Sequence, residues 1–218
     1  MQGVADADFE AAALAYIKKT LVDHQRIIFN GNGYAAEWEV EAARRGLANH
    51  KTTAEALRAM VDPKAIELFE EFGVLTEVEQ RSRYEIKLEK YAKLLNIESR
   101  VMERMTRRTY LPAITRFARE TADAATALAG IGAENAPSVA LAQKLGEGLM
   151  QAALAAEKLL EVHETAEGIA DPQAKADYYA EKVVPAMEGL REEIEALEVI
   201  TSRDVWPVPS SNTMLFYV

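Results

Sequence analysis

The stretch from Thr76 to Ala129 constrains the fold more than any other part of the sequence. It contains no glycine and a single proline, Pro112. Thr76 followed by Glu79 forms a capping box, which marks the start of a helix. Helix-breaking residues follow the stretch, namely Gly130, Gly132 and Pro137. One continuous helix over this length would be a rod of roughly 80 Å, at a rise of 1.5 Å per residue.

A rod of this length needs other helices to cover its apolar side, because helix propensity alone gives marginal stability. Apolar side chains recur at steps of three and four residues on both sides of Pro112, as in an amphipathic helix of an antiparallel bundle. They are Tyr84, Leu88, Tyr91, Leu95, Met102 and Met105, then Leu111, Ile114, Ala118, Thr121, Ala125 and Leu128. We expect Pro112 to kink or split the rod, since proline removes a backbone hydrogen bond.

Further helices are predicted on either side of the rod. Residues 6–24 have a helical apolar face, and residues 138–168 form a second long helix. Val183, Met187, Leu190, Ile194 and Leu197 then make a coiled-coil seam, with Pro185 off the seam. Between residues 35 and 75, helix start signals predict a cap of short helices. The predicted fold is therefore all-α: an antiparallel helical bundle built on a very long kinked helix, with a cap of short helices and an extended C-terminal tail.

The tail has a different character from the bundle. The segment Trp206–Pro209 contains two prolines and cannot be helical, and Met214–Val218 is apolar throughout. Free termini are usually polar, so we expect this segment to dock. Two docking places are open, the chain's own bundle and a neighbouring subunit.

Composition excludes several classes of function. The net charge is −10, which disfavours nucleic acid and anionic membranes as partners, because both need clustered positive charge. The sequence has no cysteine, which excludes disulfides and thiolate sites and favours the cytoplasm. No apolar run is long enough to span a bilayer. The first residues lack the basic flank and apolar core of a signal peptide.

The segment Arg26–Tyr34 reads Arg-Ile-Ile-Phe-Asn-Gly-Asn-Gly-Tyr and is the least ordinary in the chain. Its Ile-Ile-Phe part favours an extended backbone. Two Asn-Gly pairs indicate tight turns with positive φ. One interpretation is a buried extended segment and a linking turn. The other is a nest of backbone amides for an anion, with Arg26 nearby. The candidate functional residues are Arg26, Asn30, Gly31, Asn32, Gly33 and Tyr34.

The sequence supplies no self-contained active site. His24, His50 and His163 are isolated, so we predict no metal site, and the Glu-rich runs are typical of solvated helix faces. A GxSxG motif, a P-loop and a Gly-rich nucleotide loop are all missing from the sequence. We therefore predict neither catalytic residues nor a bound cofactor in this chain. A basic patch lies in the middle of the rod and consists of Arg104, Arg107 and Arg108. Two interpretations are open, salt bridges on the surface and a groove for an anionic partner, and we favour the salt bridges.

The segment Arg26–Tyr34 resembles part of the C-terminal region of type III glutamine synthetases, and the likeness as a whole covers about residues 10–218 in the family's order. Two strings carry most of it, Ile27–Tyr34 and Ser82–Ile86. The other matching positions are Trp38, Ala43–Leu47, Lys51–Thr53, Ile66–Phe69, Gly73–Glu77, Asn96–Glu98, Leu111–Ala113, Val184–Met187 and Trp206–Pro207.

This resemblance implies a cytoplasmic ligase that makes glutamine from glutamate, ammonia and ATP with Mg²⁺ or Mn²⁺, and that assembles as a double-ringed homo-oligomer. The family's metal, nucleotide and phosphate sites lie in upstream domains, and none of their motifs is present here. By this resemblance, residues 1–25 are the terminal helix of the preceding catalytic domain. Residues 26–75 are the Asn-Gly loop and short-helix cap, and residues 76–218 are the long-helix bundle with its apolar tail.

Two functions follow from these observations. The first is a structural and assembly role as the C-terminal domain of such a synthetase, whose partners are the rest of the enzyme and neighbouring subunits. The second is an independent helical adaptor that binds a protein partner through the rod and the tail.

Overall fold

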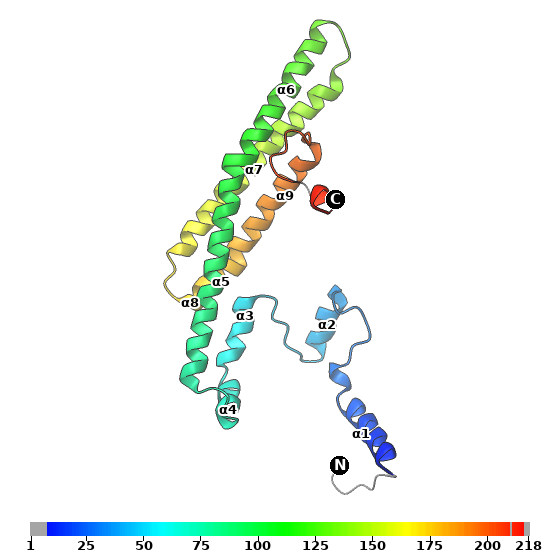
Figure 1. Cartoon of the computed structure of the whole chain (residues 1–218), viewed down its shortest axis with the longest axis vertical. Helices are drawn as coiled ribbons and strands as arrows, with labels where there is room; N and C mark the ends of the chain where they lie inside the picture. The colour runs from blue at the N-terminus through cyan, green and yellow to red at the C-terminus, as the bar shows by residue number, and fades with distance from the viewer. Residues whose placement is uncertain (1–7, 210, 216–218) are drawn as a thin grey trace. The chain divides into compact units, whose positions relative to one another are not determined.

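The computed structural model describes residues 8–209 and 211–215, and within these ranges the chain is helical without a β-strand (Figure 1). The all-α prediction is confirmed. The chain divides into two compact units, residues 1–51 and residues 52–218, which we describe separately. Asp6 and Ala7, at the start of the first predicted helix, lie outside the described residues.

The first unit contains helix α1 (Phe9–Asp23), the 3-10 turn η2 (Gln25–Ile27) and helix α2 (Ala36–Arg44). Helix α2 ends before Gly46, whose φ of 71° favours glycine, as is common just after a helix. Helix α1 buries none of its residues. Three side chains of its apolar face are each about half exposed within the described chain: Phe9, Ile17 and Leu21.

The second unit begins with the short helices α3 (Thr53–Arg58) and α4 (Pro63–Glu71), joined by the 3-10 turn η3 (Ala59–Val61). Each of these two helices has an N-cap side chain. Thr52 Oγ1 accepts a hydrogen bond from Glu55 N, and the Asp62 carboxylate accepts one from Lys64 N. Side chains tie these helices to the bundle: Arg58 pairs with Asp177 at 2.5 Å, and Gln173 Nε2 donates to Ala54 O at 3.2 Å.

The predicted rod is a continuous helical run made of α5 (Glu77–Met105), the π-helical turn η4 (Thr106–Tyr110) and α6 (Leu111–Gly130). Its capping box is confirmed, because Thr76 and Glu79 bond each other's backbone amides. The run ends before Gly132, whose φ is 72°.

Both internal prolines follow a π-helical turn. Pro112 lies two residues beyond η4, and Pro185 lies two residues beyond η5 (Tyr179–Val183). In an α-helix a proline ring meets the carbonyl four residues earlier. That residue is Arg108 for Pro112 and Glu181 for Pro185, and each lies in the middle of its π-helical turn. A widened turn therefore accommodates each proline, and the helical run continues past it without ending.

The remaining helices pack alongside the rod. Helix α7 (Ala136–Glu167) returns next to α6 and α5, and α8 (Pro172–Tyr178), η5 and α9 (Val184–Ile200) follow it (Figure 1). The predicted seam of α9 is confirmed, with Val183, Leu190 and Leu197 fully buried. The buried core of the bundle consists of Ala92, Ala156, Leu159, Ala166, Tyr179, Val183, Ala186 and Leu190 at one end and Ile114, Leu145, Ala152 and Leu197 at the other.

The tail leaves the bundle at Thr201. Residues 202–209 are not helical, which confirms the prediction for Trp206–Pro209, and Trp206 packs on Tyr110 with ring centroids 5.2 Å apart. One short helix follows, α10 (Ser211–Leu215), on which Met214 and Leu215 are exposed. Of the segment Met214–Val218, which we expect to dock, Met214 and Leu215 are not covered by the chain's own bundle, and Phe216–Val218 lie outside the described residues. The prediction of an extended tail is wrong for Ser211–Leu215, which is helical. Among the described helices, none has both the length and the apolar character that a bilayer span requires.

Candidate functional site

The candidate loop lies between α1 and α2 in the first unit. Ile27 belongs to η2, Ile28 has an extended backbone (φ −91°, ψ 124°), and residues 30–35 turn the chain into α2. Ile27 and Ile28 are exposed, so the expected burial of this segment is wrong for both. The physical reason is that the small first unit offers little core in which these two side chains could be buried.

The two Asn-Gly pairs form the turn without left-handed glycines. Positive φ occurs at Gly46, Gly73 and Gly132 among the described residues, so the predicted positive φ at Gly31 and Gly33 is wrong. Side-chain and backbone bonds replace it: Asn32 Oδ1 accepts from Tyr34 N at 3.0 Å, and Asn32 O accepts from Ala35 N at 3.1 Å. An Asx turn of this kind reverses the chain within ordinary backbone angles.

Arg45, at the end of α2, organises the loop. Its Nη1 donates hydrogen bonds to the carbonyl oxygens of Arg26, at 3.2 Å, and of Ile28. Its guanidinium also lies over the Phe29 ring, 5.8 Å from the centroid, and Phe29 packs on Trp38 with centroids 4.6 Å apart. The sequence analysis did not single out Arg45 for this role, and its position within the string Ala43–Leu47 is the only signal that could have found it.

Glu41 holds the two arginines of α2. Its carboxylate accepts from Arg44 Nε and Nη2, both at 2.6 Å, and from Arg45 Nε at 2.5 Å. These hydrogen bonds, first those from Arg44 and then that from Arg45, lower the pKa of Glu41 to about 2. The carboxylate therefore stays ionised at neutral pH and orients Arg45 toward the loop carbonyls.

The candidate residues themselves are placed as follows. Asn30 and Arg45 line a shallow pocket of about 440 Å³ together with Leu21, Val22, Gln25 and Ile28. Gly31 lies so close to Phe29 that a Cβ atom there would collide with the ring, whereas Gly33 faces open space. Tyr34 is fully exposed. Arg26 contributes its carbonyl to Arg45, as described above. The loop therefore presents polar and aromatic groups, and its role stays a prediction.

The second unit contains a buried polar cluster between α5 and α7. Ser99 Oγ donates to Asn96 O at 3.0 Å and lies 2.8 Å from His163 Nδ1. The serine has one hydroxyl hydrogen, so two arrangements fit: if it goes to Asn96 O, His163 Nδ1–H donates to Ser99, and if it goes to His163 Nδ1, Nε2 carries the ring hydrogen. Nε2 has no hydrogen-bond partner among the described residues and lies 3.7 Å from Glu167 Oε1. Burial lowers the pKa of His163 against the opposing influence of the Glu167 carboxylate.

This serine, histidine and glutamate do not form a nucleophilic triad. A nucleophilic serine needs a hydroxyl that a substrate can reach, whereas Ser99 is fully buried 3.0 Å from a backbone carbonyl. His163 is among the residues that line a cavity of about 210 Å³, together with Arg100, Glu103 and Arg104. The cluster is a polar connection between two helices, in which one ring nitrogen has no hydrogen-bond partner among the described residues.

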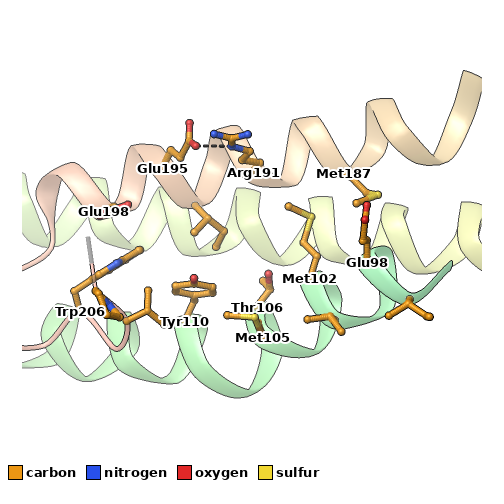
Figure 2. A pocket seen from close by; sticks show the side chains of 15 residues that line it. Glu98, Met102, Met105, Thr106, Tyr110, Met187, Arg191, Glu195, Glu198 and Trp206 are labelled. Carbon is orange, nitrogen blue, oxygen red and sulfur yellow. Dashed lines mark hydrogen bonds and ion pairs between the residues drawn. The ribbon is translucent and has the colours of Figure 1, made fainter. Parts of the chain in front are cut away.

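An apolar groove lies between α5 and α9. It has a volume of about 550 Å³ and is closed at one end by Trp206, Val208 and Pro209. Figure 2 shows Met102 and Glu98 on α5 pointing toward α9, with Met187 opposite them. Within the described ranges, no three side chains of histidine, aspartate and glutamate are placed to hold a metal ion.

Comparison of this chain with known proteins identifies a family that it matches. The glutamine synthetase C-terminal domain family matches residues 12–129. A glutamine synthetase of Butyrivibrio fibrisolvens is 32% identical over 202 residues, and a type-3 glutamine synthetase of Dictyostelium discoideum is 32% identical over 206 residues. A glutamine synthetase of Bacteroides fragilis is 27% identical over 213 residues.

These alignments cover nearly the whole of this chain but a small part of each relative. The alignments with the Butyrivibrio fibrisolvens and Dictyostelium discoideum proteins each include 92% of this chain, and they include 29% and 28% of those relatives. The alignment with the Bacteroides fragilis protein includes 95% of this chain and 29% of that relative. The chain thus spans less than a third of the length of the synthetases it matches. The resemblance noted at Ile27–Tyr34 and Ser82–Ile86 is confirmed, and the chain belongs to the glutamine synthetase C-terminal domain family.

Proposed function

We propose that this chain is the helical C-terminal domain of a type III glutamine synthetase and serves structure and assembly, with the chemistry in other parts of the enzyme. The observation that carries this proposal is the alignment of nearly the whole chain with under a third of each relative.

The whole enzyme would join ammonia to glutamate with ATP and Mg²⁺ or Mn²⁺, in the cytoplasm, as a homo-oligomer. The described residues do not fit either cofactor. No three of their histidine, aspartate and glutamate side chains are placed to hold a metal ion. The apolar groove between α5 and α9 has three carboxylates at its edge, from Glu98, Glu195 and Glu198, which repel a triphosphate. No step of the ligation is therefore assigned to this chain.

Helix α1 would pack against the catalytic part of the enzyme. Its apolar face is uncovered within the described chain, with Phe9 49%, Ile17 50% and Leu21 52% exposed. Full burial of an exposed side chain of this kind contributes roughly 1.5–3 kcal/mol of stability. The gain here is smaller, because each of the three side chains is already about half covered. The test is to replace Ile17 and Leu21 with serine in the full synthetase and to measure its oligomeric mass. Loss of assembly is expected, and an intact oligomer would contradict this contact.

The Asn-Gly loop would contact the catalytic region, because it follows α1 directly. Gly31→Ala and Gly33→Ala test this as a matched pair in the full enzyme. The Gly31 change displaces the Phe29 ring, whereas the Gly33 change meets open space. We expect reduced ligase activity for Gly31→Ala and a smaller effect for Gly33→Ala. If both variants assemble and react as the unmodified enzyme does, the loop is only a connection.

The assembly role has its own experiment. Deletion of the matching region from a full-length relative should leave a protein that no longer forms the complete oligomer, as measured by mass. Adding this chain as a separate polypeptide should restore the mass if the contacts are non-covalent. A deletion variant that keeps the full oligomeric mass would contradict the proposal.

An independent adaptor is the second candidate, and the open groove between α5 and α9 favours it. The two candidates differ in the size of the protein in the cell. An antibody against this chain should detect a product several times heavier than 24.1 kDa if it is part of a synthetase. A product of 24.1 kDa alone would favour the adaptor.

A further inference from the structure

The groove between α5 and α9 is long and narrow. Its lining on the α5 side runs from Ile97 to Tyr110, and on the α9 side from Met187 to Glu198. At a rise of 1.5 Å per residue, thirteen residue steps on the α5 side correspond to about 20 Å, or between three and four helical turns. The groove thus has the length of a short helix.

The floor of the groove is apolar and adaptable. Ile97 and Val101 are 51% and 46% exposed although they lie on the face between two helices. Met102, Met105 and Met187 line the space beside them. Methionine side chains are flexible and polarizable, and they are over-used at surfaces that bind apolar helices. The π-helical turn η4 contributes Thr106 and Tyr110 to the lining, and such turns are frequent at functional sites.

The edge of the groove is acidic. Glu98 lies on the α5 side, and Glu195 and Glu198 lie on the α9 side (Figure 2). The lining includes one cation, Arg191, and its Nε donates to Glu195 Oε1 at 2.5 Å, so these two charges offset each other. Two carboxylates remain in excess. A second copy of this chain would place the same carboxylates opposite them, which costs energy through like-charge repulsion.

We propose that this groove binds an amphipathic helix of a separate protein, with an apolar face of three to four turns flanked by lysine or arginine. The apolar side chains of that helix fill the space over Ile97, Val101 and the methionines. Its cations meet Glu98 and Glu198, in the manner of a helix bound in a groove. This inference does not depend on the role in synthetase assembly, since it concerns a face within the second unit alone.

The test uses a synthetic helix of leucine and lysine, about four to five turns long, and a second peptide with glutamate in place of lysine. The sequence has two tryptophans, Trp38 and Trp206, so Trp38→Phe leaves Trp206 at the end of the groove as the fluorescent reporter. Saturable binding of the lysine peptide with a Kd on the order of 10 µM is expected, and at least about tenfold weaker binding of the glutamate peptide.

A matched pair of charge reversals locates the binding. Glu98→Lys with Glu198→Lys alters the groove edge, and Glu89→Lys with Glu192→Lys makes the same change of net charge on exposed positions of the same two helices outside the lining. The groove variant should bind the lysine peptide with an affinity lower by about tenfold or more, and the control variant with an affinity lower by less than about threefold. Equal losses in both variants would overturn the proposal, because they would indicate attraction to the overall charge of the chain.

Two other occupants would also overturn it. If the lysine peptide binds only after removal of residues 216–218, the chain's own end fills the groove. If the groove reversal lowers the oligomeric mass of the chain in the absence of peptide, a second copy fills it. Replacing Ile97 and Val101 with serine tests the apolar floor with little effect on the core, since both are about half exposed. Unchanged affinity in that variant would contradict an apolar contact.

Discussion

His163 Nδ1 lies 2.8 Å from Ser99 Oγ and shares a hydrogen bond with it across the interface of α5 and α7. This bond holds a buried histidine ring whose Nε2 has no hydrogen-bond partner among the described residues and lies 3.7 Å from Glu167 Oε1. The charged groups that face the ring are Glu167 and Glu164 from α7 and Arg100 and Glu103 from α5. Protonation of His163 would place a positive charge near the Glu167 carboxylate, which favours it, but in a buried site, which disfavours it.

Stability should therefore fall on acidification. The pKa of His163 is lowered in the folded chain, so between that value and the ordinary value of about 6.5 the unfolded chain binds more protons. The contribution is fully present above pH 6.5 and is lost as the pH falls through that value toward the lowered pKa. Urea unfolding measured from pH 8 to pH 5 should show this slope, and His163→Gln should reduce it. An unchanged slope in the variant would contradict a buried neutral His163.

Truncation of a side chain on α7 should destabilise the bundle only where that side chain faces the core. Leu159 is fully buried, whereas Leu154 is 53% exposed on the same helix. Leu159→Ala should lower the free energy of unfolding by about 2–5 kcal/mol, through lost transfer energy and a residual cavity. Leu154→Ala is the control and should cost less than about 1 kcal/mol. Equal losses at the two sites would mean that α7 faces its neighbours differently.

Two glycines of α7 provide a second matched pair. A Cβ at Gly148 would lie 2.7 Å from Cδ2 of the buried Leu197, and a Cβ at Gly146 meets nothing within 4 Å. Alanine in a helix interior is more favourable than glycine by about 1 kcal/mol. Gly146→Ala should therefore raise the free energy of unfolding, and Gly148→Ala should lose this gain because Leu197 must move. The same gain at both positions would contradict the close packing of α7 on α9.

Most of the bundle could be predicted from the sequence because local signals decide it. The capping box at Thr76 and the seam through Leu190 and Leu197 depend on residue type and spacing alone. The π-helical turns before Pro112 and Pro185 could not be predicted in the same way. A proline shows where the ladder of hydrogen bonds is interrupted, whereas packing on neighbouring helices decides whether the helix stops or widens.

The candidate loop was harder to predict than the bundle. The Asn-Gly pairs indicated left-handed glycines, but the Asn32 side chain closes the turn instead. The role of Arg45 depends on contacts with Arg26 and Ile28, which are distant in sequence, so no local pattern reveals it. The groove between α5 and α9 likewise results from how two helices diverge, which spacing along either helix does not encode.

Arg45 should control the order of this loop. Arg45→Lys keeps the charge but cannot bond two carbonyls and Glu41 together, because lysine lacks the planar fork of arginine. Trp38 fluorescence, measured with Trp206→Phe as background, should shift toward that of exposed tryptophan. Arg44→Ala is the control, since its hydrogen bonds go to Glu41 alone. The idea fails if Arg44→Ala disturbs Trp38 as much as Arg45→Lys does.

The Glu41 carboxylate reports on the same contacts. NMR titration should give a pKa of about 2 in the unmodified chain, because Arg44 and Arg45 both donate to it. The double variant Arg44→Ala with Arg45→Ala should return the pKa toward its ordinary value near 4.5. The contribution of these contacts to folding is present above pH 4.5 and is lost as the pH falls toward 2. A pKa that stays near 2 in the double variant would contradict this assignment.

The central claim is that this chain is a domain without reactive groups of its own. The most direct measurement is an assay of the folded, purified chain with glutamate, ammonium, ATP and Mg²⁺ or Mn²⁺, following the release of phosphate and the formation of glutamine. We expect neither product above the rate without protein. Glutamine formation that depends on this chain and on ATP would contradict the account.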